Sequence, residues 1–457
     1  MAERKLTRKE LVKRAGVGAA AVGLGGTAGL EKAFAFAGPH KFTHKDLKYS
    51  LSILQWVHFV PAYDKWLDNT YIKAWGQKND CDVKIDHINN TELAARAAAE
   101  VAAQSGHDLF MFLNPRADLE DQVINHAPIV QEVNNRLKSK MNDLALKSTY
   151  NPKTKKYHGF SDGYVPDPVV WRHDLWNDVG ESPATWDHVL KAAPKLKANG
   201  HPIGIGMSNE LDSNMANIAL MQCFGSYIQN AKHQPVINSK NTVNVLKYMK
   251  QLYETGMTNE IFGWNPAANN TYLYSGKGSL ILNAISATRT PEQLGLPFSD
   301  NLWIWPIPKG PHGRLGYQHV MGSWWIWKFA KNQAAAKKFL ADLEINYKDA
   351  FLASKYYNFP SFPGAFPFAK IRKAVAQDTH KPRGKYGVLT TIAQKYTTNP
   401  GHPGYSNAAF GEMFSKFLIP KMFAEVSQKK MTAQEAVNAA DREIKQIYAK
   451  WRKLGKI

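Results

Sequence analysis

The sequence predicts an α/β protein with two lobes, each built on a mainly parallel sheet flanked by helices. Residues 47–113 follow the order strand, helix, strand, helix, strand, which favours a parallel sheet with right-handed crossovers. A second series of short strands and helices begins after residue 156. The 457 residues, 44% of them hydrophobic, suffice for two or three cores, so we expect two domains.

Residues 1–37 have the features of an export signal. Residues 7–13, TRKELVK, nearly match the twin-arginine pattern, with Lys9 in place of the second arginine. A glycine- and alanine-rich stretch over residues 15–30 follows, and residues 35–37 fit an A-x-A cleavage site. The stretch is too short and too rich in glycine for a membrane span. No cysteine lies near the cleavage point, so we expect a soluble, periplasmic protein without a lipid anchor, exported by the twin-arginine or the general route.

The first lobe begins with the alternating pattern of residues 48–55, which is typical of a strand. The next segments are a helix within residues 60–79, a strand over 83–88, a helix over 91–105 and a strand over 109–113. The last of these is an unbroken apolar run, so we expect helices on both faces of the sheet. Ligands of such sheets bind beyond the carboxyl ends of the strands, here at Trp56, Asn89 and Asn114.

The entry into the second lobe is the stretch from residue 156 to residue 200. Gly159 and Gly163 flank the polar pair Ser161-Asp162 in a turn-rich segment, and residues 169–171 have the composition of a strand. A helix starts after Thr185, a natural N-cap, and stops at residues 199–200.

The rest of the chain continues this alternation. The patterns predict a strand over 203–207, helices over 215–227 and 241–256, a strand ending at Asn283, a strand over 303–306, a helix capped by Asn332, a crossing over 356–368 and a last helix opened by a capping box at Thr432 and Glu435. Gly276-Lys277 is not a phosphate-binding loop, because Thr271 stands where its first glycine should be and Gly278 replaces the Ser or Thr.

Three passages resemble the extracellular solute-binding proteins of ABC importers, the group that includes the maltose-binding proteins. The first is the family's G-x-P-Y…Y-Y-N-K-D-L…G…P-x-T-W-D-E passage, matched by Gly159, Trp171, Asp174, Leu175, Gly180, Pro183, Thr185, Trp186 and Asp187. Residues 271–283 and 316–343 resemble two further passages of the family. The chain departs from the first passage at Asp162, where an aromatic residue is common, at Arg172-His173 and at His188.

The resemblance implies a type II periplasmic binding protein fold, in which several crossing strands join the lobes as a hinge. It implies a first lobe of residues 45–154 plus 308–347 and a second lobe of residues 155–307 plus 348–457. It also implies a substrate-binding protein that captures a mono- or oligosaccharide between the lobes and delivers it to a membrane permease. We expect a monomer without metal or cofactor.

Charge and cysteine content exclude some classes of partner. The formal net charge is +20, but the lysines and arginines are spread along the chain, which favours a solvated basic surface over a nucleic-acid or lipid site. The two cysteines, Cys81 and Cys223, are too few for a disulfide scaffold, and we expect two separate buried thiols.

Sugars are recognised by flat rings against their C–H faces and by planar polar groups on their hydroxyls. The candidate ligand contacts lie at predicted strand ends and crossings and are Trp56, Asn114, Arg116, Asp162, Asn209, Asn283, Ser323, Trp324 and Tyr357, with Trp264 as a weaker addition. Each has an ordinary structural alternative: core packing for the tryptophans, a salt bridge for Arg116, and a cap or turn for the two asparagines at 209 and 283 and for Tyr357.

Two other functions remain open at the sequence level. Asp162, Glu210 and Asp212 could bind a polyamine or another cation, and Arg116 could bind an anion. A secreted carbohydrate-active enzyme is the other alternative, although the sequence has no H-E-x-x-H motif.

Overall fold

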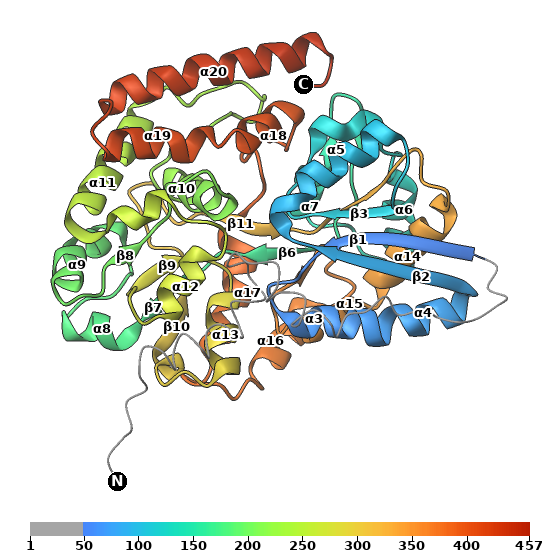
Figure 1. Ribbon diagram of the computed structural model, residues 1–457, viewed down its shortest axis with the longest axis horizontal. Helices are drawn as coiled ribbons and strands as arrows, with labels where there is room; N and C mark the ends of the chain where they lie inside the picture. The colour runs from blue at the N-terminus through green and yellow to red at the C-terminus, as the bar shows by residue number, and fades with distance from the viewer. Residues whose placement is uncertain (1–48) are drawn as a thin grey trace.

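The structure is a computed structural model that describes residues 49–457. The predicted export signal, residues 1–37, lies outside the described residues. Figure 1 shows two α/β lobes side by side, with strands β6 and β11 between them. This arrangement confirms the predicted two-lobed α/β fold class.

The first lobe is built on a sheet of order β12-β3-β1-β2. β1 (Tyr49–Trp56) pairs in parallel with β2 (Cys81–Ile88) and β3 (Leu109–Phe112), while β12 (Ser323–Ile326) is antiparallel to β3. The helices of this lobe are α3 (Pro61–Trp66), continued by a π-helical turn, α4 (Ile72–Asn79), α5 (Leu93–Ala103), α6 (Ala127–Leu137), α7 (Asp143–Thr149), α14 (Gln333–Ile345) and α15 (Tyr347–Ala353). All of β3 is buried, as its unbroken apolar run predicts.

The second lobe is built on a sheet of order β10-β7-β9-β8. Its strands are β7 (Val169–Arg172), β8 (Ile203–Gly204), β9 (Leu280–Leu282) and β10 (Leu302–Trp305). β7 is antiparallel to both β9 and β10, and β8 is parallel to β9, so three strands run in one direction and β7 runs in the other. In both lobes the reversed strand, β12 or β7, directly follows a strand that crosses between the lobes.

The crossing strands form a third sheet, of order β13-β6-β11-β14. β6 (Gly163–Pro166) is antiparallel to β11 (Gly316–Met321) and to β13 (Phe359–Pro360), and β14 (Thr397–Thr398) is parallel to β11. β6 leads into β7, and β11 returns the chain to β12, as the family resemblance implies. Figure 1 shows this sheet in the centre of the molecule.

The remaining helices cover the second lobe and the crossing sheet. They are α8 (His173–Asp178), α9 (Trp186–Ala198), α10 (Leu211–Cys223), α11 (Lys240–Gly256), α12 (Ala268–Tyr274), α13 (Ser286–Leu294), α16 (Phe368–Val375), α17 (Leu389–Thr391), α18 (Ala408–Ser415), α19 (Leu418–Ser427) and α20 (Ala433–Lys453), and a hairpin joins β4 (Tyr150–Asn151) to β5 (Lys156–Tyr157). The predicted caps are confirmed at Thr185, which begins α9, and at Thr432, whose capping box with Glu435 begins α20.

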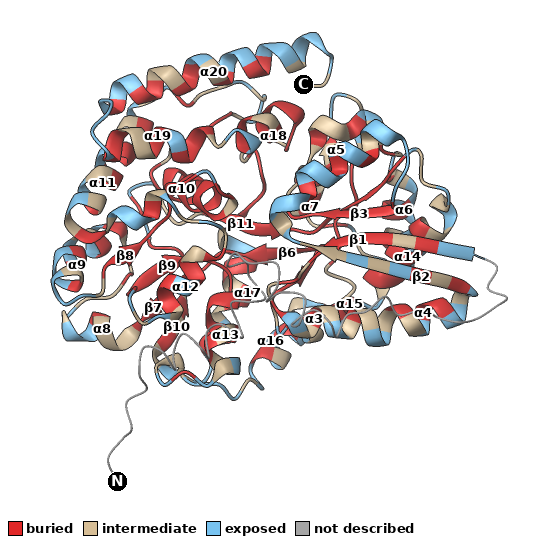
Figure 2. Ribbon diagram, viewed as in Figure 1, coloured by how far each residue is buried: buried red, intermediate tan, exposed pale blue. Residues whose placement is uncertain are grey.

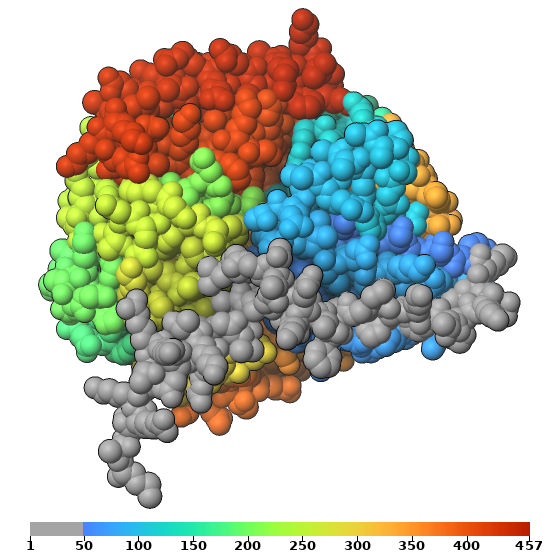
Figure 3. Space-filling view, viewed as in Figure 1, coloured from blue at the N-terminus to red at the C-terminus, as the bar shows by residue number. Residues whose placement is uncertain are grey.

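The C-terminal helices reach across to the first lobe. Figure 3 shows α18 to α20 along one end of the molecule, next to the first lobe. After α20, the Lys456 ammonium lies 2.5 Å from the Asp121 carboxylate, and its carbonyl accepts a hydrogen bond from the Asn151 side chain at 3.1 Å. The C-terminal end of the chain therefore joins the first lobe through contacts separate from the crossing strands.

Each lobe has its own large hydrophobic core. One core contains β1, β3 and β12 with the first-lobe helices, and the other contains β7 to β9 with α9 to α11 and α18 to α20. Figure 2 shows that buried residues concentrate on the strands. Cys81 and Cys223 are free, buried thiols, as predicted. None of the helices between residues 49 and 457 has the length and hydrophobicity that a bilayer crossing requires.

Candidate ligand-binding site

A cluster of buried titratable side chains lies where the second lobe meets the crossing strands. His319 is on β11, Asp167 directly follows β6, and Asp212 is in the first turn of α10. The His319 ring places Nδ1 3.5 Å from the Asp167 carboxylate and Nε2 3.8 Å from the Asp212 carboxylate. All three side chains are buried. One imidazole therefore lies between two carboxylates that come from different parts of the fold.

These neighbours change the pKa values of the cluster. Burial by itself lowers the pKa of His319, but the charges of Asp212 and Asp167 outweigh burial and raise it. Burial raises the pKa of Asp212, and burial together with the Asp212 charge raises that of Glu210 to about 8. Near neutral pH the Glu210 carboxyl is therefore protonated.

Glu210 is held in place by the start of α10. As the N-cap residue, its carboxylate accepts hydrogen bonds from the backbone N–H groups of Asp212, at 2.7 Å, and of Ser213. This cap directs Asp212 toward His319, because it fixes the first turn of the helix.

Asparagine side chains border the cluster on the second-lobe side. Asn269, on α12, donates to the Asp212 carboxylate at 2.6 Å. Asn283, directly after β9, donates to the side-chain carbonyl of Asn270 at 2.8 Å. All three asparagines are buried. They supply amide groups of the kind that bind hydroxyls, which is the property for which the sequence analysis selected Asn283.

Aromatic side chains border the cluster on the first-lobe side. The Tyr357 ring contacts the His58 ring at 5.1 Å between centroids, and His58 stacks on Trp56 at 4.8 Å. The Tyr357 side chain is fully buried, and its hydroxyl has no hydrogen-bond partner within residues 49–457. Burial, and then the charges of Asp212 and Asp167, raise the pKa of Tyr357.

Three further candidates lie near the carboxyl ends of the strands. Asn114, after β3, accepts a hydrogen bond at 2.8 Å from Gln318, the residue next to His319. Arg116 makes a two-bond ion pair with Asp118, at 2.8 and 2.9 Å, within its own loop. Asn209 is exposed just before α10. Of these three, Asn114 is linked most directly to the cluster.

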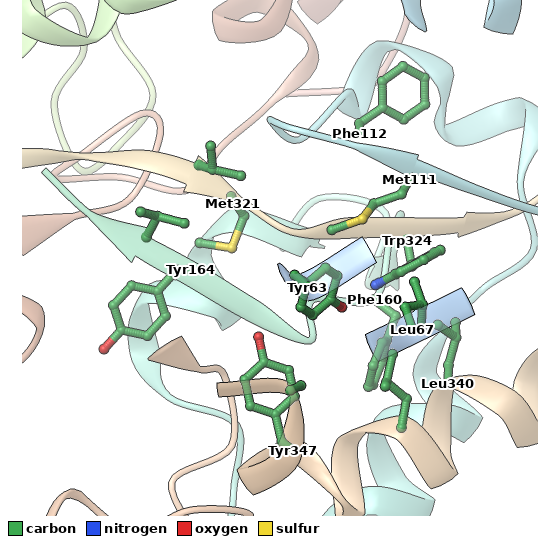
Figure 4. Packing of buried hydrophobic residues seen from close by; sticks show 14 of the residues in the cluster. Tyr63, Leu67, Met111, Phe112, Phe160, Tyr164, Met321, Trp324, Leu340 and Tyr347 are labelled. Atoms are coloured by element: carbon green, nitrogen blue, oxygen red, sulfur yellow. The ribbon is translucent and has the colours of Figure 1, made fainter. Parts of the chain in front are cut away.

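Asp162, Ser323 and Trp324 lie in a second buried group, inside the first-lobe core. Burial raises the pKa of Asp162 to about 6. Figure 4 shows Tyr63, Tyr347 and Trp324 beside β6, and the polar tips of all three are without hydrogen-bond partners within the described chain. Ser323 accepts a hydrogen bond from the Trp325 indole at 2.8 Å. These residues support β6 and β12 from within the first lobe.

Sequence reasoning did not select Asp167, His319 or His58. Two signals could have found the first two: Asp167 stands between two prolines, at the end of a crossing strand, and His319 is a charged residue within the otherwise apolar or neutral run of β11. Glu210 and Asp212 were considered only for a cationic ligand. Within residues 49–457, no group of three or more His, Cys, Asp or Glu side chains is arranged to hold a metal ion.

Two α/β lobes, a sheet of crossing strands and a polar cluster at their junction define a two-lobed binding protein of the periplasmic type. The model of the bacterial extracellular solute-binding protein family matches residues 64–357, and the chain belongs to this family.

Solved structures of sugar-bound proteins share the fold. The maltose-bound MalE3 of T. maritima is 17% identical, with a TM-score of 0.70 over 87% of this chain and 100% of that one. An ABC transporter solute-binding protein of Thermotoga lettingae TMO with bound α-D-tagatose is 13% identical, with a TM-score of 0.72 over 88% and 100%. A sugar transporter of Arthrobacter chlorophenolicus A6 with laminaribiose is 14% identical, with a TM-score of 0.71 over 87% and 99%. No curated protein sequence matches the chain.

Proposed function

We propose that the chain is the periplasmic substrate-binding protein of an ABC importer, which captures a mono- or oligosaccharide between its lobes and delivers it to a membrane permease. Family membership supports the capture of a solute, and the sugars bound by proteins of the same fold support a carbohydrate. The observation that carries the proposal is the buried cluster of His319, Asp167 and Asp212, where the second lobe meets the crossing strands.

The chemistry of the cluster suits a hydroxyl-rich ligand. Carboxylates of Asp167 and Asp212 accept hydrogen bonds from hydroxyl groups, and the amides of Asn269 and Asn283 can both donate and accept. The Tyr357 ring offers a flat face for C–H groups. A buried polar group that loses its partner costs about 1–3 kcal/mol, which gives such a site its selectivity.

Capture requires that the ligand bind the closed arrangement of the lobes better than the open one. A solute held by Asp212 on the second lobe and Tyr357 beside the first would contact both lobes only when they are closed. The strands β6 and β11 would then act as the hinge. The permease would recognise the closed pair of lobe surfaces.

The remaining parts of the proposal concern organisation and location. We assign residues 45–154 and 308–347 to the first lobe and residues 155–307 and 348–457 to the second, with residues 1–37 as the export signal. Within 348–457, most of α15 and the following residues to Tyr357 pack in the first-lobe core. The pairing of β12 with β3 and the packing of α14 on α6 support the assignment of the 308–347 segment. The protein would act as a periplasmic monomer.

The first test is ligand binding by the purified mature chain. Maltose, laminaribiose, tagatose, glucose and spermidine are titrated by calorimetry, and the melting temperature is recorded with each. We expect at least one carbohydrate to bind at micromolar concentration, to raise the melting temperature and to be recovered unchanged. Binding of spermidine alone would favour the cation-binding alternative, and hydrolysis of a sugar would favour a secreted enzyme.

A further inference from the structure

The turn that follows α15 has an unfavourable backbone conformation. Lys355 and Tyr356 have φ angles of 54° and 73°, in the left-handed region that is costly for residues other than glycine. Helices often end with one residue of this kind, usually glycine, but here two successive residues with long side chains adopt it. Backbone strain persists only where the surrounding structure holds it, and it concentrates at functional sites.

The same turn carries two side chains that contact His58. The Tyr357 ring lies 5.1 Å from the His58 ring between centroids, and the side-chain oxygen of Asn358 lies 3.3 Å from Nε2 of the same imidazole. Tyr357 packs in the first-lobe core, and Tyr356 packs against that core. The turn over residues 355–358 therefore determines where the Tyr357 ring lies in the first lobe.

Arg289 reaches this turn from the other lobe. It lies on α13, whose Ala287 forms a small core with residues of β7, β9 and β10 in the second-lobe sheet. The Arg289 guanidinium donates two hydrogen bonds to the backbone carbonyl of Lys355, from Nε at 3.2 Å and from Nη2 at 3.1 Å. Its Cζ atom lies 5.1 Å from the centre of the Tyr356 ring. One side chain of the second lobe thus contacts both residues that have a positive φ.

The guanidinium is itself fixed by buried partners. It makes ion pairs with Glu292 at 3.0 Å and with Asp378 at 2.9 Å, and its Cζ atom lies 3.6 Å from the centre of the Tyr386 ring. Arg289 is only 8% exposed. These contacts use the planar, forked donors of arginine, which a lysine ammonium does not reproduce. They orient the guanidinium so that Nε and Nη2 face the carbonyl group of Lys355.

We propose that Arg289 is a positioning residue, which holds the strained turn over residues 355–358 from the second lobe and thereby places the Tyr357 ring for the ligand. Its role in binding rests on the carbohydrate function proposed above, in which Tyr357 contacts the ligand. The hold on the turn does not rest on that function, because protein atoms alone make the contacts. Without Arg289 the turn relaxes from its strained conformation, and part of the binding free energy is then spent on ordering it again.

Hydrogen exchange of the mature chain tests the hold on the turn. The backbone N–H groups of residues 355–358 all donate hydrogen bonds, so their exchange reports on opening of the turn. It is followed by mass spectrometry near neutral pH in the wild type and in Arg289→Lys, which keeps the positive charge. We expect exchange of these amides to be about tenfold faster in Arg289→Lys, because the forked bonds to Lys355 are lost.

Arg172 provides a matched control. It is also 8% exposed, makes an ion pair with Asp174 and lies 4.8 Å from the centre of the Phe298 ring, and both partners belong to the second lobe. Arg172→Lys should therefore leave the exchange of residues 355–358 unchanged. A difference between the two variants separates the effect on the turn from the general loss of a buried arginine.

A double-mutant cycle tests the role in binding. Calorimetry uses the carbohydrate that binds most tightly in the first test. We expect Arg289→Lys to weaken binding about fivefold in the wild-type background. In Tyr357→Leu the ring is absent, so Arg289→Lys should change the affinity by less than about twofold. A purely structural defect would weaken binding equally in both backgrounds.

Thermal unfolding checks that each variant is folded. If Arg289→Lys does not fold, Asp378→Asn takes its place in both measurements, because it weakens the attachment of the guanidinium and keeps the shape of the side chain.

The outcomes separate the inference from the function on which it rests. Unchanged exchange of residues 355–358 would overturn the proposal whether or not a carbohydrate binds. Faster exchange with equal losses of affinity in both Tyr357 backgrounds would overturn the role in placing the ring. Failure of every carbohydrate to bind would overturn the proposed function and with it the role of Arg289 in binding, whereas the exchange result would still decide whether Arg289 holds the turn.

Discussion

His319 illustrates what single residues contribute and why the sequence did not single it out. Its partners Asp167 and Asp212 lie in distant parts of the chain, and only the pairing of β6 with β11 and the docking of α10 bring them together. Local patterns predict strand ends, and of the candidates chosen there Asn114 accepts a hydrogen bond from Gln318, the neighbour of His319 on β11. Patterns of this kind do not reveal which side chains meet across a crossing sheet.

A histidine in the first lobe makes the unfolding free energy depend on pH in a way that can be measured. His87 on β2 lies 3.0 Å from the Asp68 carboxylate and 3.8 Å from that of Asp64. Burial lowers its pKa, but the hydrogen bond to Asp68 and the two charges outweigh burial and raise it to about 9. Because the folded pKa exceeds the unfolded value near 6.5, this stabilisation is complete below pH 6.5 and is lost as the pH rises through 9.

The test is urea unfolding at pH 6 and pH 9.5. The raised pKa of His87 corresponds to a difference of at most about 3 kcal/mol in the unfolding free energy between the two pH values. We expect His87→Gln to lose most of that pH dependence. His188→Gln, at a half-exposed position, should behave as the wild type. A pH dependence that is the same with and without His87 would contradict the raised pKa.

At the scale of elements, the sequence predicts a strand or a helix well where the signal, a hydrophobic periodicity or a cap residue, lies within the element itself. Such patterns predict the order of β1 to β3, the cap at Thr185 and the capping box that begins at Thr432. The direction of β7 does not, because a strand pattern carries no information about which way its partner runs. That direction is set by β6, which carries the chain across from the first lobe.

The crossing sheet depends on one glycine for its close packing. A Cβ atom on Gly163, in β6, would lie 2.8 Å from the backbone carbonyl of Phe359 on β13 and would collide with the Tyr347 hydroxyl. We expect Gly163→Ala to destabilise the protein by about 1–3 kcal/mol, as overpacking in a rigid core does. Chemical unfolding measures the change.

Gly387 provides the control for this prediction. A Cβ atom there would meet no other atom within 4 Å, so Gly387→Ala should change the unfolding free energy by less than about 0.5 kcal/mol. Equal effects of the two substitutions would show that the space around β6 is not the cause.

At the scale of the whole molecule, two cores joined by a thin crossing sheet permit the lobes to move relative to each other. The first core ends at the crossing strands, the second begins with β7, and the junction cluster lies between them. The fold class and the family follow from sequence patterns, whereas the identity of the site follows from how the lobes meet. For that reason the second buried group, around Asp162, could be separated from the junction cluster only with the structure.

The contacts of Lys456 and the crossing strands both lie at the interlobe boundary. They therefore affect the free energy of lobe closure. The central claim is that a carbohydrate binds at this boundary, in contact with both lobes.

A crystal structure of the mature chain with the sugar that binds most tightly in calorimetry tests this claim most directly. We predict electron density for the sugar at the junction, with hydrogen bonds to Asp212 and contact with the Tyr357 ring. Sugar density on an outer surface, or in contact with only one lobe, would contradict the claim.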